Sequence, residues 1–434
     1  MKTLFSNVTA VLMDELGTVL QNAFVAVDGT AIAHVGTERP QGTFDREVDG
    51  TGKILMPGLV NCHTHLPMTM LRGYGGGCDL HTWLNQYIFP AEDKLDARAA
   101  RAATGLALAE LIASGVTCYA DMYFFCDEMI EETLAAGISA NIARGVSVFT
   151  PDFDFDTFYA TKELKALVPR WNGCNDGQIR IDASVHAEYT SYPAVWRRIA
   201  DYAKEQGIGM HVHVSETKSE HDECIGRHGL TPAAALAKEG VFDVRAIAAH
   251  CVWCTEEDMA ILQEKGTTAV HCPASNLKLG SGVAPVPALL KQGVNVALGT
   301  DGVSSNNSHD MFEELKLAAI LHNGVSHDPL AVLPMDALRM ATCNGAKALG
   351  RPDSGSIAVG KTADLILLDG QTPNMTPCHS VVDNVAYACG RADLVMNMAR
   401  GKVIYEKGDF LTLDLDRIRS EVEHYAMPLM FGKE

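Results

Sequence analysis

The sequence predicts an α/β protein: a (β/α)8 barrel of the TIM type with a small β-sandwich domain built from both ends of the chain. Three observations lead to this prediction. Strand-like apolar runs alternate with longer helical patterns through the middle, both ends are rich in short β signals, and polar residues recur where the predicted strands end. We place the small domain at residues 1–57 with 355–434, and the barrel at 58–354.

Short β signals mark both ends of the chain. Residues 24–27 and 31–35 are apolar and enclose an Asp-Gly pair, which is typical of a hairpin with a tight turn. Residues 363–368 and 402–405 have the same strand-like character, and residues 415–425 have the apolar spacing of a helix. Because two β-rich ends flank a different middle, we expect one domain assembled from both.

Eight strands are predicted in the middle of the chain. They are residues 59–61, 116–121, 138–146, 179–186, 208–215, 246–250, 268–271 and 294–300. Helical patterns such as 97–113 and 193–205 separate them. Eight alternations over this length favour a closed barrel over an open doubly wound sheet. The glycines at 73–77 lack the strand and helix that a dinucleotide-binding turn needs.

Composition excludes several classes of function. With 434 residues, 47% hydrophobic and 21% charged, the chain has the composition of a folded globular protein. The net charge of −19 disfavours nucleic acid or an anionic membrane surface as a partner. No apolar run approaches the ~20 residues of a membrane span, and no signal-peptide core is present, so we expect a cytoplasmic protein.

The twelve cysteines are scattered, which in a cytoplasmic chain indicates reduced thiols. Cys251 and Cys254 have CxxC spacing, but no second pair accompanies them. Buried thiols are therefore the favoured interpretation, ahead of a zinc or redox site.

Polar residues gather at the predicted strand ends. In chain order they are His63, His65, Arg144, His186, His211, His213, Glu216, His250, His271 and Asp301. The carboxyl ends of parallel barrel strands all open on one face, where loops build active sites. One such histidine is ordinary in a core, but a set of this size is hard to attribute to packing.

A divalent metal explains part of this set. His63 and His65 are two apart on a predicted strand, so both side chains point to the same face. Together with one histidine of the fifth strand and Asp301 they make an N3O set, which suits zinc, with iron as the alternative, and leaves a position for water. A second metal usually needs a bridging carboxylate or modified lysine. The fourth strand supplies His186 there, so we expect one metal per subunit.

The remaining candidates have competing interpretations. Glu216 is placed to carry protons, or is a solvated glutamate at the start of a helix. His250 orients or polarises the attacking water, or is a core histidine, and for His271 we favour the core. The histidines that we assign to the surface or to loops are His81, His221, His228, His309, His322 and His379.

With these motifs in view, the chain resembles the amidohydrolase superfamily, and within it the aminohydrolases that act on adenine nucleosides. The resemblance covers nearly the full length. The motifs that carry it are residues 57–65 (PGLVNCHTH), 115–117 (GVT), 213–216 (HVSE), 273–282 (PASNLKLGSG), 299–302 (GTDG) and 360–365 (GKTADL).

The resemblance implies a metal-dependent hydrolytic deaminase of purine salvage, in which activated water adds at C6 and ammonia leaves. It assigns the metal to His63, His65, His213 and Asp301. It further implies the following roles: Glu216 protonates the purine ring nitrogen, His250 and Asp301 handle the water, Trp83 and Glu92 contact the nucleoside (Glu92 through the ribose hydroxyls), Arg144 and His186 make further substrate contacts, and Ser305 lies close to the metal aspartate. A homo-oligomer, dimer or tetramer, is also expected.

One segment departs from the family pattern. The family has a second arginine about a dozen residues after Arg144, which serves the carboxylate of S-adenosylhomocysteine, whereas residues 150–156 here are acidic and contain no arginine. An anionic 5′ group would meet repulsion there. We therefore expect methylthioadenosine, 5′-deoxyadenosine and adenosine to be preferred, unless Arg72 or an arginine of a neighbouring subunit replaces the missing one.

Two alternatives remain open from sequence. The first is a related aminohydrolase acting on guanine, oxidised guanine or a triazine, against which the pairing of Glu92 with Arg144 argues for a ribose. The second is a non-catalytic barrel that serves as a binding or scaffold protein. Such chains usually lose ligands, and here every expected ligand position is filled.

Overall fold

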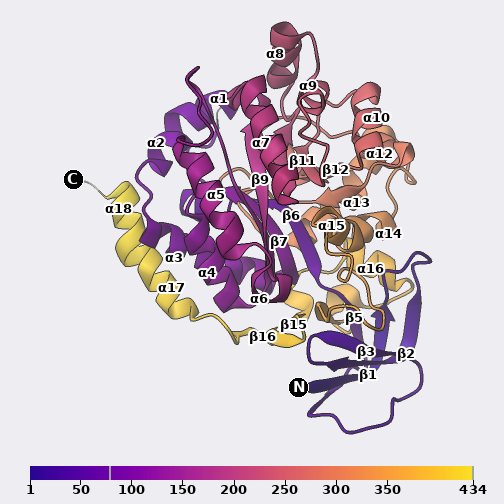
Figure 1. The fold of residues 1–434 in the computed structure, drawn as a ribbon. Helices are drawn as coiled ribbons and strands as arrows, with labels where there is room; N and C mark the ends of the chain where they lie inside the picture. Colours follow the sequence, from indigo (N-terminus) through magenta and orange to yellow (C-terminus); the bar gives the residue numbers. More distant parts are fainter. Residues whose placement is uncertain (78–79, 433–434) are drawn as a thin grey trace.

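The barrel is formed by eight parallel strands in the order β13-β12-β11-β10-β9-β8-β7-β6 (Figure 1). This computed structural model describes residues 1–77 and 80–432. The strands are β6 (Leu59–Thr64), β7 (Val116–Tyr123), β8 (Ser139–Arg144), β9 (Ile179–Ala187), β10 (Gly209–Val214), β11 (Ala246–His250), β12 (Thr268–His271) and β13 (Val296–Leu298). The predicted barrel is confirmed, with each strand within a few residues of its expected position.

The barrel is nearly closed between β13 and β6. Just beyond β13, the Asp301 N–H donates to the carbonyl of His63 at 2.9 Å. The Thr300 N–H donates to Oδ1 of Asn61 at 3.1 Å. Gly299 allows this approach, because a Cβ there would lie 2.8 Å from the Cβ of His63. These contacts bring the end of the last strand against the first.

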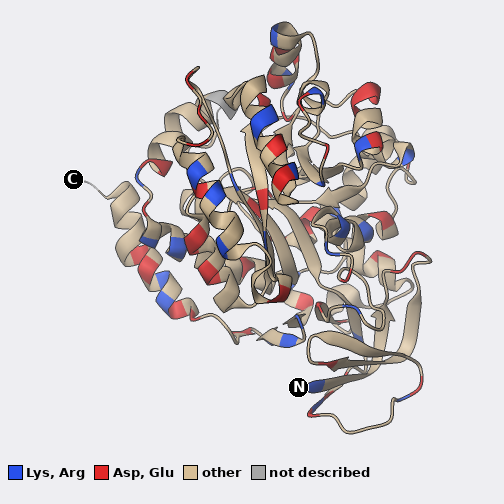
Figure 2. Cartoon of the chain, in the orientation of Figure 1, with Lys and Arg blue, Asp and Glu red and all other residues tan. Residues whose placement is uncertain are grey.

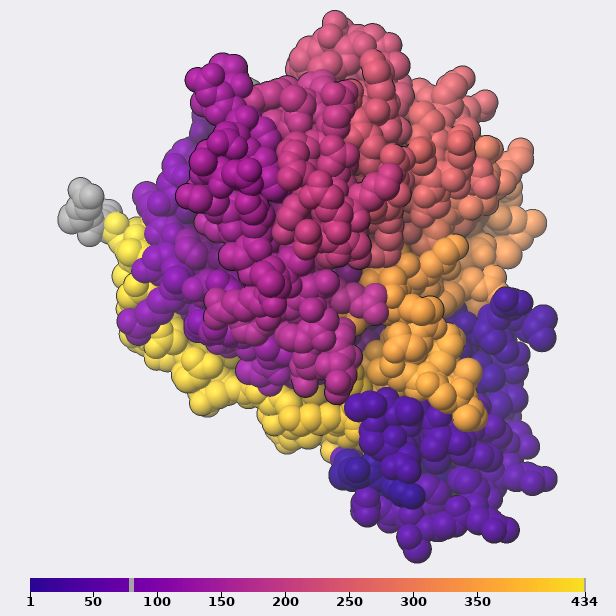
Figure 3. Space-filling model, viewed as in Figure 1, coloured from indigo at the N-terminus to yellow at the C-terminus, as the bar shows by residue number. Residues whose placement is uncertain are grey.

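A second, nine-stranded sheet joins the two ends of the chain. Its strands are β1 (Lys2–Val11), β2 (Val19–Asp28), β3 (Ala31–Gly36), β4 (Arg46–Asp49), β5 (Lys53–Pro57), β14 (Leu365–Asp369), β15 (Leu394–Ala399), β16 (Lys402–Glu406) and β17 (Asp409–Phe410). The antiparallel pairing of β5 with β14 joins the N-terminal strands to the C-terminal ones. Figure 3 shows the N-terminal residues as an indigo lobe beside the barrel.

Helices surround the barrel, and many of them carry charged residues (Figure 2). They are α1 (Leu80–Trp83), α2 (Phe89–Glu92), α3 (Ala97–Ala113), α4 (Cys126–Ala136), α5 (Tyr159–Trp171), α6 (Cys174–Gly177), α7 (Pro193–Gln206), α8 (Lys218–His228), α9 (Pro232–Lys238), α10 (Glu256–Lys265), α11 (Pro273–Lys278), α12 (Val286–Gln292), α13 (Met311–Ser326), α14 (Pro334–Met340), α15 (Cys343–Ala348), α16 (Val381–Tyr387), α17 (Leu415–Glu421) and α18 (Met427–Phe431). Figure 2 shows the barrel strands mostly without charge. In the described chain, no helix is long and apolar enough to cross a membrane.

The C-terminal helical segment lies against the barrel. The helix predicted over 415–425 is present as α17 and a π-helical turn (Val422–Ala426), and it continues through α18. Ile418 is buried against α3, where the glycine at position 105 leaves room for its side chain. The yellow segment in Figure 3 accordingly follows the edge of the barrel.

His221 and His322 lie buried on helices α8 and α13, so their assignment to the surface or to loops is wrong. His309 lies in a loop, as assigned, but it is buried. His309 Nδ1 hydrogen-bonds with the Thr300 hydroxyl at 3.0 Å, and His322 Nε2 lies 3.1 Å from His271 Nε2. The partner of His322 lies 51 residues away in the sequence, so no local pattern reveals it. The side chain of His81 lies outside the described part of the structure. His379 is exposed, and Cys251, Cys254 and His271 are buried as expected.

The closure at Gly299 yields a stability prediction. In Gly299→Ala the new methyl group would meet the backbone nitrogen of His63 at 2.9 Å, and backbone has little room to move. We expect urea unfolding to show a loss of about 1–3 kcal/mol in unfolding free energy. Gly324→Ala in α13 is the matched control, because nothing lies within 4 Å of the position that its Cβ would take and alanine favours a helix by about 1 kcal/mol. Equal stability of both variants would contradict this account of closure.

Candidate metal centre and active site

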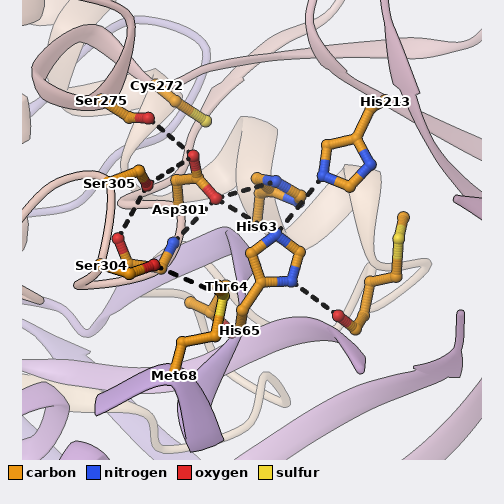
Figure 4. Close-up of polar contacts among 12 residues, drawn as sticks. His63, Thr64, His65, Met68, His213, Cys272, Ser275, Asp301, Ser304 and Ser305 are labelled. Carbon is orange, nitrogen blue, oxygen red and sulfur yellow. Dashed lines mark hydrogen bonds and ion pairs between the residues drawn. The ribbon is translucent and has the colours of Figure 1, made fainter. Parts of the chain in front are cut away.

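Four residues converge at the carboxyl ends of the barrel strands (Figure 4). His63 and His65 come from the end of β6, His213 from β10, and Asp301 from the turn after β13. Asp301 Oδ1 lies 3.4 Å from His63 Nε2 and 3.2 Å from His65 Nε2, while His65 Nε2 lies 3.4 Å from His213 Nε2. The structure thus brings together the four residues that the sequence assigns to a metal.

Hydrogen bonds on the far side of each ring set the tautomers. Nδ1 of His65 donates to the carbonyl of Met122 at 2.6 Å, and Nδ1 of His213 donates to the carbonyl of His186 at 2.7 Å. Nδ1 of His63 pairs with Nε2 of His211 at 2.8 Å. Each ring therefore presents Nε2 to the cluster, and contacts of this kind are typical around metal-binding histidines.

Burial favours the neutral form of two of these rings, which is the form that can bind a metal. It lowers the pKa of His63 to about 3 and the pKa of His213 well below its ordinary value. Nε2 of His63 is buried and has no hydrogen-bond partner among the described residues. A neutral imidazole with an unpaired inward nitrogen is suited to bind a metal.

The remaining two groups, His65 and Asp301, attract each other, and a divalent ion bound between them would take the place of the proton on His65. Burial lowers the pKa of His65, but the hydrogen bond and charge of Asp301 outweigh it and raise that pKa to about 9. Burial alone would raise the pKa of Asp301, yet His63 and His65 hold it well below its usual range. Asp301 also accepts hydrogen bonds from Ser275 and Ser305, at 2.7 and 2.9 Å, which fix the carboxylate.

The donor set fits a divalent metal. First-row ions bind His and carboxylate at about 2.0–2.2 Å, which places neighbouring ligand atoms about 3–3.5 Å apart. The 3.2–3.4 Å separations between the ligand atoms of His63, His65, His213 and Asp301 fall in this range. His63, His65 and His213, and likewise His63, His250 and Asp301, offer ligand atoms within 4.8 Å of one another. The geometry of these donors therefore fits a divalent-metal site.

Glu216 and His250 stand beside this cluster. Nδ1 of His250 donates to the side-chain oxygen of Asn276 at 2.9 Å, and its Nε2 lies 3.9 Å from Glu216 Oε2. Burial raises the pKa of Glu216, although the charge of His250 acts in the opposite direction. Glu220 holds the loop, since its carboxylate accepts from the Glu216 N–H at 2.7 Å. Ser215 and His250 both have positive φ, so the strand ends are strained where these groups emerge.

A cavity of about 720 Å³ extends from the cluster. All five residues predicted to contact substrate line it: Trp83, Glu92, Arg144, His186 and Ser305. The indole nitrogen of Trp83 donates to the carbonyl of Tyr74 at 3.1 Å. Burial lowers the pKa of His186 to about 4, so this ring is neutral. A volume of this size suits a small organic ligand.

Glu92 is unusual among the cavity acids. Burial raises its pKa to about 7, and the hydrogen bond that the Tyr123 hydroxyl donates to it lowers the value only in part. The carboxyl group therefore titrates near neutral pH. Tyr123 itself lines the cavity and was not identified from sequence.

The acidic segment 150–156 does not line the cavity, so the repulsion that the sequence predicts at this segment is misplaced. Asp154 accepts from the Thr157 hydroxyl at 3.0 Å, and Asp156 pairs with Lys165 at 2.6 Å. The proposed substitute Arg72 is also absent from the cavity wall, because it pairs with Glu110 at 2.6 Å.

The fold and the site together define a class: a TIM barrel with a histidine and aspartate metal site at the carboxyl ends of its strands, as in metal-dependent hydrolases. The chain belongs to the Amidohydrolase family, which it matches over residues 54–404.

Similar proteins cover the whole chain. A 5-methylthioadenosine/S-adenosylhomocysteine deaminase of Caldanaerobacter subterraneus subsp. tengcongensis is 41% identical over 434 residues, covering 100% of both chains. A 5′-deoxyadenosine deaminase of Methanosarcina mazei is 36% identical over 427 residues, with 98% of each chain covered. Among solved structures, an adenosine deaminase from Xanthomonas campestris with bound zinc has a TM-score of 0.93 and 33% identity, with 98% of each chain covered.

The convergence of the four ligands yields a prediction on metal content. His65→Ala and Asp301→Ala should each lose most of the bound divalent metal, because each removes one donor from the cluster. Elemental analysis of purified protein measures this, with exposed His379→Ala as the control for loss of a histidine. Wild-type metal content in both cluster variants would show that the ion binds elsewhere.

Proposed function

We propose that this protein is a hydrolytic deaminase of adenine nucleosides that holds one divalent ion per chain, zinc with iron as the alternative. The observation that carries the proposal is that one cavity is lined both by the Glu216, His250 and Asp301 cluster and by Glu92 with Tyr123. The former suits attack on a purine carbon, and the latter suits recognition of a sugar. The names of the full-length relatives support the same substrate class.

His63, His65, His213 and Asp301 would hold the ion, which when bound lowers the pKa of water and so supplies a nucleophile near neutral pH. The remaining chemistry belongs to the chain. His250 Nε2, whose ring is fixed by Asn276, orients the water together with Asp301 and takes up its proton. Asn276 thereby acts as a positioning residue, although the sequence motif around it gave no role.

Glu216 supplies the proton that the purine ring nitrogen needs. Burial raises its pKa above the ordinary value, which suits a group that must both accept and release a proton. Water adds at C6 while the ring nitrogen is protonated. The proton taken up by His250 passes to the amino nitrogen, the bond from C6 to that nitrogen breaks, and ammonia leaves. Glu216 recovers a proton from the new hydroxyl at C6, which becomes the carbonyl of the product. Trp83, Arg144 and His186 line the rest of the cavity and position the nucleoside.

Glu92 would bind the ribose hydroxyls, because a buried carboxylate is a strong acceptor for two O–H donors. Free adenine should then be a poor substrate, since it leaves these polar groups unpaired. We rank methylthioadenosine, 5′-deoxyadenosine and adenosine above S-adenosylhomocysteine. The guanine, oxidised guanine and triazine alternatives are not favoured, because these substrates have no sugar hydroxyls for Glu92 to accept.

A panel of substrates tests the proposal. Ammonia release should be measured with adenosine, 5′-deoxyadenosine, methylthioadenosine, S-adenosylhomocysteine, adenine, guanine and a triazine, before and after chelation. Release from the nucleosides that is lost on chelation is expected. Release from guanine or the triazine alone would overturn the proposal.

A cytoplasmic homo-oligomer, dimer or tetramer, completes the proposal. The cysteines within the described residues are all free thiols, which supports a reducing compartment.

Replacing the proton carrier gives a direct prediction. Glu216→Gln should keep its metal but lower kcat by about 10²–10⁴-fold, which is the usual contribution of a positioned acid or base. Steady-state kinetics with metal analysis measures both properties. Exposed Glu257→Gln on α10 is the control. Near-normal turnover of Glu216→Gln would mean that the proton comes from another group.

The pH profile tests the role of Glu92. Because its pKa is about 7, the ionised carboxylate that accepts the ribose hydroxyls is lost as pH falls through neutrality. We expect kcat/KM for adenosine to fall below about pH 7, approaching tenfold per unit, since kcat/KM reports the free protein. Glu92→Gln should not show this fall of kcat/KM at low pH, whereas Asp93→Asn, a variant of the neighbouring residue, should show it. If Glu92→Gln showed the same fall of kcat/KM below about pH 7, the titrating group would be another residue.

A further inference from the structure

One face of α5 forms part of the cavity wall. Tyr159, Glu163, Leu167 and Arg170 all line the cavity. Their spacing of four, four and three residues is that of a single helical face. This face places the carboxylate of Glu163 and the guanidinium of Arg170 along the same wall as Arg144, which ends β8.

Arg144 is held by protein groups on several sides. Its Nε donates to Glu163, and one of its terminal nitrogens donates to the carbonyl of Gly145. The guanidinium carbon lies 5.8 Å from the centre of the Phe124 ring and 5.6 Å from that of Tyr159. The Arg144 side chain is only 7% exposed, whereas that of Glu163 is 52% exposed. The buried cation therefore already has its counter-ion.

The second arginine of the wall is also paired. Arg170 lies 3.1 Å from Asp127 and stacks on the ring of Trp171, with its guanidinium carbon 4.7 Å from the ring centre. Two guanidinium groups and seven carboxyl groups line the cavity among the described residues. The acids are Glu92, Asp93, Asp127, Glu128, Glu163, Glu216 and Asp301. The wall thus offers an incoming anion more repulsion than attraction.

We propose that Glu163 is a specificity-determining residue: by occupying Arg144 it excludes substrates with a carboxylate in the 5′ substituent and favours uncharged, apolar ones. This inference rests on the proposed function and deepens it. Glu163 holds Nε of Arg144 and neutralises its charge, so a substrate carboxylate would compete with Glu163 for the guanidinium. An uncharged thioether meets no such competition, and sulfur packs well against rings such as Phe124 and Tyr159.

The test compares kcat/KM for methylthioadenosine and S-adenosylhomocysteine in the wild-type protein and in Glu163→Gln. The amide keeps the size of the side chain but removes its charge, which leaves Arg144 available to a substrate carboxylate. In Glu163→Gln, the ratio of kcat/KM for S-adenosylhomocysteine to kcat/KM for methylthioadenosine should rise about tenfold. Glu128→Gln is the matched control, because it removes one negative charge from the same wall without releasing an arginine, and its ratio should change by less than about twofold.

The double variant Glu163→Gln/Arg144→Gln should not show this rise in the ratio, because it lacks the guanidinium that would bind the substrate carboxylate. Since Glu163 is half exposed, its replacement leaves the buried core untouched. An unchanged ratio in Glu163→Gln, a rise of the same size in Glu128→Gln, or a gain that survives in the double variant would each overturn the assignment. A wild-type protein that deaminates neither nucleoside would overturn the proposed function and the assignment with it, whereas turnover of methylthioadenosine with an unchanged ratio overturns the assignment alone.

Discussion

The active site depends on the burial of three imidazoles and one carboxylate against one another. Polar groups taken out of water need partners, and a divalent cation is the partner that we propose for these inward-facing ligand nitrogens. The barrel supplies the geometry, because β6, β10 and the turn after β13 all end on the same face. Positive φ at Ser215, His250 and Asp301 shows that the backbone is strained at the points where these strands deliver their groups.

The nine-stranded sheet helps to position the ligands because one of its strands continues directly into the first strand of the barrel. Strand β5 pairs with β14 of the C-terminal half, then passes through Gly58 into β6, whose end carries two of the four ligands. Only glycine fits at position 58, because a Cβ would lie 2.3 Å from the side chain of Thr117 on β7. The N–H of Gly58 donates to the carbonyl of Asp364 at 2.9 Å, within the GKTADL motif. Both halves of the chain therefore fix where the first barrel strand begins.

Much of the fold was predictable because its signals are local: apolar runs indicated the strands, and i, i+2 spacing placed His63 and His65 on one face. The supporting contacts were not predictable in this way. Asn276 orients His250 and His211 pairs with His63, both across separations in sequence that only the folded barrel closes. Glu220 holds the Glu216 loop from only four residues away, as part of a capping box with Thr217 that we did not identify from sequence. The acidic segment 150–156 was misjudged because nearness to Arg144 in sequence does not place a residue in the cavity. Glu163, which follows that segment in the chain, reaches the cavity through the helical face of α5.

X-ray absorption at the metal edge tests the central claim most directly, because it reports the atoms around the ion without any change to the protein. We expect a first shell of nitrogen and oxygen at about 2.0–2.2 Å, with the outer scattering of imidazole rings. A sulfur shell at about 2.3 Å would instead place a thiol such as Cys272 on the metal. A second metal at about 3.5–4 Å would replace the single-ion site by a two-metal one. Either result would contradict a centre built from His63, His65, His213 and Asp301 alone.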